Sequence, residues 1–375
     1  MTHPIQELHQ LGQSLWYDNI QRRLLEDGTL AGMIERNEIR GVTSNPSIFN
    51  KAIGNSQDYD REIWDLTGYG KSREEIYEEL VIADIQRAAE LFLPLYQETN
   101  GGDGYISLEV NPHLAHDSKG TAVEAQRLWE QVDRPNLMVK IPATKEGLPA
   151  IRQTIAAGVN VNVTLIFGID RYRSVMEAYL DGLSDRLERG EEIHGVASVA
   201  SFFISRIETR VDQRIGELIK EHPEQEEHLN DLYGRAAVAS GKVAYQAYQE
   251  VLGEDNPRFA DLTAKGASRQ RVLWASTSTK DPRYSDVKYV EEMIGPDSVN
   301  TVPPSTLEAF RDHGKAEITI NQDLDDARQA LTALENAGLS LDQITQSLEE
   351  EGVRSFTEAY DDLLETIQRR MDKAP

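Results

Sequence analysis

Residues 137–142 read Leu137-Met138-Val139-Lys140-Ile141-Pro142, a short apolar run of the kind that forms a buried strand. A longer stretch with helical periodicity follows it. Seven comparable runs, each with its own helical stretch, end at Leu15-Trp16-Tyr17-Asp18, Gly41-Val42-Thr43-Ser44-Asn45-Pro46, Ile106-Ser107-Leu108-Glu109-Val110, Val161-Asn162-Val163-Thr164-Leu165, Ala197-Ser198-Val199-Ala200-Ser201-Phe202, Val272-Leu273-Trp274-Ala275-Ser276 and Val299-Asn300-Thr301-Val302-Pro303. This alternation predicts parallel βαβ units, and eight of them is the number that closes a (β/α)8 TIM barrel.

An open, doubly wound sheet is the alternative α/β architecture. It normally has a glycine-rich phosphate turn after its first strand, and none follows Asp18. Two connections, Asn45 to Glu109 and Ser201 to Ser276, are too long for one crossover helix. We therefore expect a single barrel domain over residues 1–375, with additional helices after the second and sixth strands and C-terminal helices from about residue 304.

Composition narrows the classes of partner. The chain of 375 residues carries a formal net charge of −25, which argues against nonspecific binding to nucleic acid or an anionic membrane. An anionic ligand must therefore meet a local cationic pocket. There is no cysteine, so disulfides, thiolate zinc sites and cysteine nucleophiles are excluded. Neither a signal peptide nor a membrane helix is visible, and a cytoplasmic location is expected.

A barrel places its active site at the carboxyl ends of its strands, where polar residues are the candidates. Lys140 is the most informative, because a charged ammonium is costly inside an apolar strand. Burial lowers a lysine pKa, and a neutral amine attacks carbonyl carbons. The alternative is a lysine that reaches the rim or pairs with a carboxylate. Two carboxylates at neighbouring strand ends, Asp18 and Glu109, resemble an acid/base set.

Other residues have structural alternatives that remain open. Asn45 before Pro46 is typical of a helix cap, Thr164 and Ser201 could be ordinary strand or cap residues, and Asn162 could be a satisfied buried amide. The histidines show no metal-ligand spacing. The acidic run Glu349-Glu350-Glu351, followed by Gly352, predicts a solvated helix end rather than a metal site.

Two segments resemble the signatures of transaldolases: Gly41-Val42-Thr43-Ser44-Asn45-Pro46-Ser47-Ile48-Phe49, and Leu137-Met138-Val139-Lys140-Ile141-Pro142-Ala143-Thr144-Lys145-Glu146-Gly147-Leu148. The second contains the lysine that forms a Schiff base in that family. The resemblance covers most of the chain from Asp18 to about Thr301. The length and the tryptophan at Trp274 are more similar to the longer bacterial transaldolases than to the short ones.

The resemblance implies a role for each catalytic candidate. Lys140 would form an imine with the C2 carbonyl of a ketose, and Asp18 would take the proton of the C4 hydroxyl as the C3–C4 bond breaks. Glu109 and Thr164 would hold the water that shuttles protons. Three residues would hydrogen-bond the retained three-carbon fragment: Asn45, Asn162 and Ser201. In the short transaldolases, two arginines and a serine bind the phosphate of the sugar. In this chain Arg206 and Ser276 match one arginine and the serine. Lys280 would replace the second arginine, and Ser278 would be a further hydrogen-bond donor.

The implied reaction transfers a dihydroxyacetone unit from sedoheptulose 7-phosphate or fructose 6-phosphate to glyceraldehyde 3-phosphate or erythrose 4-phosphate, in the non-oxidative pentose phosphate pathway. Sugar phosphates are the expected partners, no cofactor or metal is expected, and the chain is expected to be a monomer or a homodimer. One rival is a fructose-6-phosphate aldolase, which has a tyrosine at the position of Glu109. Another is a noncatalytic barrel, which would be expected to have lost Lys140, Asp18 or Glu109.

Overall fold

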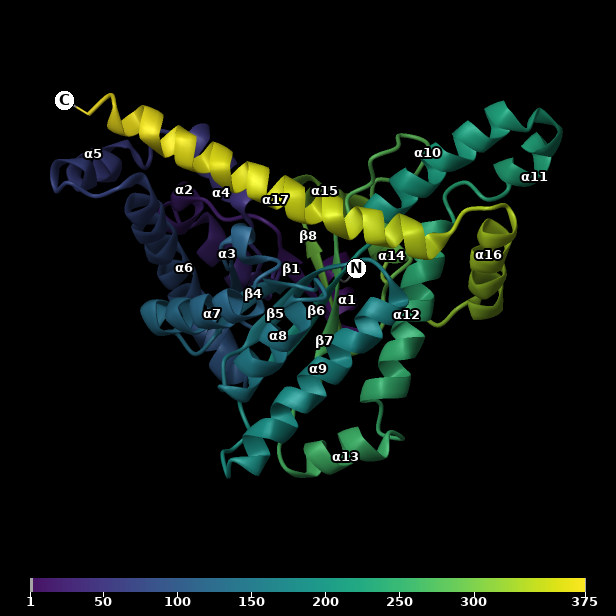
Figure 1. Cartoon of the computed structure of the whole chain (residues 1–375), viewed down its shortest axis with the longest axis horizontal. Helices are drawn as coiled ribbons and strands as arrows, with labels where there is room; N and C mark the ends of the chain where they lie inside the picture. Colours follow the sequence, from purple (N-terminus) through teal and green to yellow (C-terminus); the bar gives the residue numbers. More distant parts are fainter. Residues whose placement is uncertain (1–2, 375) are drawn as a thin grey trace.

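The computed structural model describes residues 3–374, and its centre is a closed barrel of eight parallel strands (Figure 1). In chain order around the barrel the strands are β1 (Gln13–Tyr17), β2 (Gly41–Val42), β3 (Tyr105–Glu109), β4 (Leu137–Pro142), β5 (Val161–Ile166), β6 (Ser198–Phe203), β7 (Arg271–Ala275) and β8 (Ser298–Val302). The ring closes between β1 and β8, where Gln13 pairs with Ser298 and Tyr17 with Val302. The predicted (β/α)8 barrel is confirmed.

Helices surround the barrel, and two connections carry more of them than a crossover needs. Between β2 and β3 lie α4 (Pro46–Gly54), α5 (Asp60–Gly68) and α6 (Arg73–Glu98); between β6 and β7 lie α10 (Ser205–Glu221), η2 (Pro223–Gln225), α11 (Glu226–Asn230), α12 (Ala236–Leu252) and α13 (Pro257–Ala264). The other helices are α1 (Pro4–Gln10), α2 (Arg22–Glu26), α3 (Thr29–Glu35), η1 (Pro112–Leu114), α7 (Ser118–Val132), α8 (Gly147–Ala156), α9 (Ile169–Glu188), α14 (Lys288–Glu291), α15 (Pro304–His313), α16 (Leu324–Asn336) and α17 (Leu341–Met371). Within residues 3–374, no helix has both the length and the apolar character needed to cross a membrane.

Local sequence determines where α4 and α6 begin. The side chain of Asn45 accepts a hydrogen bond from the Ile48 amide, and Pro46 occupies the first helical position, where its missing N–H costs nothing. Ser72 and Glu75 form a capping box at the start of α6. Because only residues 43–45 separate α4 from the end of β2, its first turns lie at the mouth of the barrel.

A buried network holds the opposite end of the barrel together. The Asp103 carboxylate accepts hydrogen bonds from Ser14 Oγ at 2.7 Å, from Trp16 Nε1 at 3.1 Å and from Arg271 at 3.1 Å. Arg40 lies 3.4 Å from the same carboxylate. Removing one member of such a buried ion pair typically lowers the free energy of unfolding by about 3–5 kcal/mol, because the other member is left buried and unpaired. The network therefore ties β1, β2, β3 and β7 into one rigid base.

The last helix, α17, runs across the molecule and carries the acidic run within its first half, well before its end (Figure 1). The prediction that Glu349-Glu350-Glu351 is a solvated helix end is wrong. Glu349 pairs with Arg171 of α9 at 3.0 Å, and Glu351 pairs with Arg210 of α10 at 2.6 Å. The two salt bridges attach α17 to helices that follow β5 and β6. Such contacts between distant parts of the chain leave no local pattern in the sequence.

Candidate active site

A cavity of about 470 Å³ opens at the carboxyl ends of the strands. It is lined by side chains from the ends of β1, β2, β4, β5, β6, β7 and β8, by the start of α4, and by Phe356 of α17. All of the predicted site residues line this cavity except two, Glu109 and Asn162. We call it the substrate cavity.

Lys140 lies at the bottom of the substrate cavity and is only 4% exposed. Its Nζ donates a hydrogen bond to the Ser44 carbonyl at 3.1 Å and lies 3.7 Å from Glu109 Oε2. The ring of Phe356 covers it, with 5.7 Å between Nζ and the ring centroid. The strand register brings the pair together, because Glu109 of β3 is opposite Lys140 of β4. A buried amine beside a carboxyl and open to a polar cavity is placed for nucleophilic chemistry.

Glu109 is buried beside this amine, and its Oε2 has no hydrogen-bond partner among the described residues. Burial raises the pKa of Glu109 to about 7, while the charge of Lys140 acts in the opposite direction. A carboxyl with a pKa near 7 both gives and takes protons at neutral pH. This is the property that a proton shuttle requires.

Asp18 follows β1 and faces the same cavity. Burial raises the pKa of Asp18, whereas the Lys140 charge and a hydrogen bond from Thr43 Oγ1 at 2.6 Å lower it. Thr43 in turn lies 2.6 Å from the hydroxyl of Thr301. This second carboxyl is thus held by hydroxyl groups of the cavity wall, whereas Glu109 contacts the lysine. The two carboxyls have different environments.

A hydrogen-bonded chain crosses the barrel beside Lys140. Ser201 Oγ donates to Asn162 Oδ1 at 2.7 Å, and Asn162 Nδ2 donates to Ser107 Oγ at 2.9 Å. Asn162 is fully buried and bonded at both ends of its amide, so it orients Ser201, which lines the cavity. Asn45 caps α4 and also lines the cavity, so the two interpretations of this residue are compatible.

Strand β5 is irregular where it meets the cavity. Its register against β6 shifts between Val163 and Ile166, and Leu165 has a φ of 60°, a left-handed conformation that is uncommon for leucine. Gly352 of α17 packs against Leu165; a Cβ there would lie 2.8 Å from Leu165 Cδ2. Thr164 lies two residues after inward-facing Asn162 and therefore lines the cavity, where its hydroxyl lacks a hydrogen-bond partner among the described residues.

Three cations line the outer part of the cavity: Lys51, Arg206 and Lys280. None of them forms a salt bridge within residues 3–374, and Lys280 Nζ instead donates a hydrogen bond to Ser278 Oγ at 2.5 Å. Burial lowers the pKa of Lys280, and the charges of Arg206 and Lys51 lower it further. Lys51 was not predicted, because it lies one turn into α4 and only the helix direction brings it to the cavity. A local cationic pocket in a chain of charge −25 is a site for an anion.

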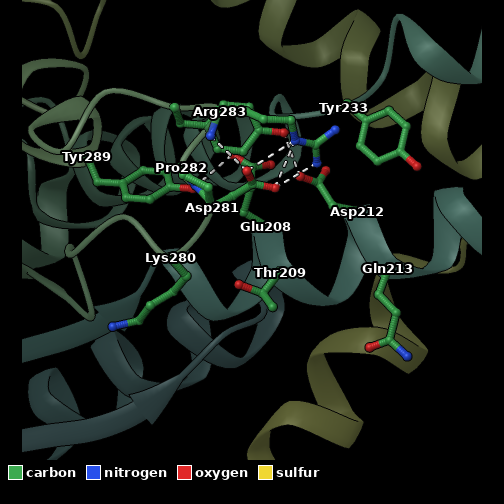
Figure 2. A pocket seen from close by; sticks show the side chains of 11 residues that line it. Glu208, Thr209, Asp212, Gln213, Tyr233, Lys280, Asp281, Pro282, Arg283 and Tyr289 are labelled. Atoms are coloured by element: carbon green, nitrogen blue, oxygen red, sulfur yellow. Dashed lines mark hydrogen bonds and ion pairs between the residues drawn. The ribbon is translucent and has the colours of Figure 1, made fainter.

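The loop that carries Lys280 is anchored on its other side (Figure 2). Tyr284 donates a hydrogen bond to Asp212 at 2.6 Å, and the guanidinium of Arg283 lies 5.0 Å from the centre of the Tyr233 ring. In Figure 2 the Lys280 side chain points away from this cluster. The anchored loop therefore presents the lysine to the substrate cavity.

Comparison with known proteins agrees with this geometry. Residues 15–367 match the model of the transaldolase/fructose-6-phosphate aldolase family. The chain belongs to this family. It is 45% identical over 371 residues to a transaldolase of Saccharopolyspora erythraea, covering 99% of this chain and 98% of that protein. It is 43% identical over 377 residues to a transaldolase of Trichodesmium erythraeum, and 44% identical over 376 residues to transaldolase 2 of Streptomyces coelicolor; these cover all of this chain and 99% and 98% of the two relatives.

The raised pKa of Glu109 gives a direct prediction for this family member. In a carbon-13 NMR titration its carboxyl should titrate near pH 7, and in Lys140→Met the midpoint should rise, because the cation that lowers it is gone. Glu146, whose pKa hydrogen bonds lower from 4.5, should titrate below that value in both proteins. The stabilising contribution of neutral Glu109 should be complete below pH 4.5 and be lost as the pH rises through 7. A midpoint that falls on removing Lys140 would contradict this electrostatic account.

Proposed function

We propose that the chain is a transaldolase that transfers a dihydroxyacetone unit between sugar phosphates through an imine on Lys140. The observation that carries the proposal is the contact of 3.7 Å between buried Lys140 Nζ and Glu109 Oε2 at the bottom of a cation-lined cavity. This reaction needs a buried amine, a carboxyl that exchanges protons with the reacting sugar, and a site for the phosphate at the mouth of the cavity.

Imine formation begins when the neutral amine of Lys140 adds to the C2 carbonyl of the ketose. The resulting carbinolamine loses its C2 oxygen as water, with Glu109 as the proton donor, and leaves an iminium ion. Thr164, whose hydroxyl has no protein partner among the described residues, is available to hold this water. The iminium is the electron sink for the next step.

Bond cleavage uses the second carboxyl. Asp18 takes the proton of the C4 hydroxyl, the C3–C4 electron pair moves toward the iminium nitrogen, and an aldose phosphate leaves. The enamine that remains is held by the hydroxyl of Ser201, oriented by Asn162, and by Asn45. When an acceptor aldose binds, the enamine attacks its aldehyde carbon, and Asp18 returns the proton to the new C4 oxygen.

The phosphate of each substrate would bind to the outer cations. Arg206 lies in the first turn of α10, whose N-terminal amides favour an anion, and the hydroxyls of Ser205 and Ser276 are 3.0 Å apart beside it. Lys280 and Ser278 approach from the anchored loop, and Lys51 approaches from α4. Cytoplasmic location, monomeric or homodimeric state and organisation as a single domain remain predictions.

A fructose-6-phosphate aldolase is the rival within the family, and Glu109 in place of a tyrosine favours transfer. Incubation with fructose 6-phosphate and erythrose 4-phosphate separates the possibilities. Transfer yields sedoheptulose 7-phosphate and glyceraldehyde 3-phosphate, aldol cleavage yields free dihydroxyacetone, and a noncatalytic barrel yields neither. We expect transfer by the wild type, its loss in Lys140→Ala, and its retention in Lys145→Ala. Free dihydroxyacetone as the main product would reject the proposal.

The three outer cations should govern the preference for phosphorylated donors. Arg206→Ala and Lys280→Ala should each raise KM for fructose 6-phosphate by about 10- to 100-fold with little change in kcat, since a charged hydrogen bond is worth about 1.5–3 kcal/mol in ground and transition states alike. Lys51→Ala should also raise KM, because it removes the third cation of the same cavity. Exposed Lys315→Ala is the control. If KM for unphosphorylated fructose rose as much, these residues would not bind the phosphate.

A further inference from the structure

A second cavity, of about 310 Å³, adjoins the catalytic centre from outside the barrel. It lies between α6, α7, η1 and α17, and we call it the side cavity. Its walls include Tyr77, Ile82, Leu114 and Tyr360, and Glu109 closes its inner end. The substrate cavity contains Lys140 but not Glu109 in its lining, whereas the side cavity contains Glu109 but not Lys140. The carboxyl of Glu109 therefore lies between the two spaces.

Glu109 lines the side cavity and retains an acceptor that no described side chain uses. It is 92% buried, its Oε2 has no hydrogen-bond partner in the described part of the chain, and its nearest charged neighbour is Lys140 on the substrate side. On the other side, burial raises the pKa of Tyr77, and the charges of Tyr360 and Glu109 raise it further. Tyr77 and Glu109 line the same side cavity, where a hydroxyl and a carboxyl can hold water between them.

Helix α17 forms a wall of both cavities. Phe356 covers Lys140 in the substrate cavity, and Tyr360, one helical turn later on the same face, lines the side cavity and packs edge-on against Tyr77 at 5.2 Å between ring centroids. The outer rim of the side cavity carries four glutamates and one arginine, Glu74, Glu75, Glu78, Glu124 and Arg127. This negative rim repels phosphate esters and admits neutral water.

We infer that the side cavity is the water route of the imine steps, which carries water between Glu109 and solvent while the substrate cavity is occupied by the sugar phosphate. The inference rests on the proposed function. Each imine formation releases one water, when Glu109 protonates the departing C2 oxygen. Each imine hydrolysis consumes one, when Glu109 takes a proton from the water that attacks C2. Phe356 covers Lys140, and a sugar phosphate bound as proposed would fill the substrate cavity above it, so the route through that cavity would be obstructed when this water must move.

Filling the side cavity tests the inference. Ile82→Trp and Leu114→Trp add bulk from two different elements, whereas Ile82→Ala widens the cavity and exposed Val123→Trp on α7 is a surface control. Two rates are measured with fructose 6-phosphate in oxygen-18 water: exchange of the C2 oxygen above the uncatalysed background, and trapping of the imine by borohydride. The tryptophan variants should slow both by at least about tenfold, within the range that general acid–base assistance supplies, and leave KM unchanged. Ile82→Ala and Val123→Trp should retain wild-type rates.

Folded tryptophan variants that exchange oxygen at the wild-type rate would overturn the inference, because water would then reach Glu109 through the substrate cavity. If both tryptophan variants fail to fold, Tyr77→Phe tests the water route instead, because it removes one hydroxyl group and leaves the ring in place. It should slow exchange several-fold with an unchanged melting temperature, and an unchanged exchange rate would equally reject the water route. A wild type that forms no imine at all would instead contradict the proposed function, so the two failures are distinguishable.

Discussion

The burial of Lys140 against Glu109 is the interaction on which the rest of the structure depends. An isolated buried charge is strongly unfavourable, so the amine and the carboxyl must share a proton or pair as ions. The register of β3 against β4 sets this contact, and a slip by one residue would turn one of the side chains out of the barrel. At the opposite ends of the two strands, Asn136 before β4 donates a hydrogen bond to the Gly104 carbonyl before β3 at 2.8 Å and so helps to preserve that register. Contacts at one end of the barrel thereby maintain the geometry of the active site at the other end.

The sequence predicts the barrel and the inner part of the site for one physical reason. Parallel strands in a closed barrel bring their carboxyl ends to one rim, so a polar residue at each strand end is placed near all the others. Lys140, Asp18 and Thr164 could therefore be grouped without knowledge of any contact. The chemical type of each residue, a buried amine beside carboxyls, then limits the reaction. Roles for the individual residues came from the resemblance and remain proposals.

The outer part of the site depends on contacts that no local pattern reveals. Phe356 and Tyr360 reach the two cavities from a helix that begins more than 190 residues after Lys140, so only the path of α17 shows their position. The acidic run predicts a helix end, whereas its glutamates pair with α9 and α10 and the helix continues through Gly352. Lys51 resembles any surface lysine of a helix until the start of α4 at the barrel mouth is known.

The central claim is that Lys140 is the covalent nucleophile, and peptide mapping by mass spectrometry tests it most directly. The protein is reduced with borohydride in the presence of fructose 6-phosphate, digested and mapped across all of its lysines. The account predicts one reduced three-carbon adduct, on the peptide that contains Lys140, and none when donor is omitted. An adduct on Lys145 or Lys280 with none on Lys140 would contradict it.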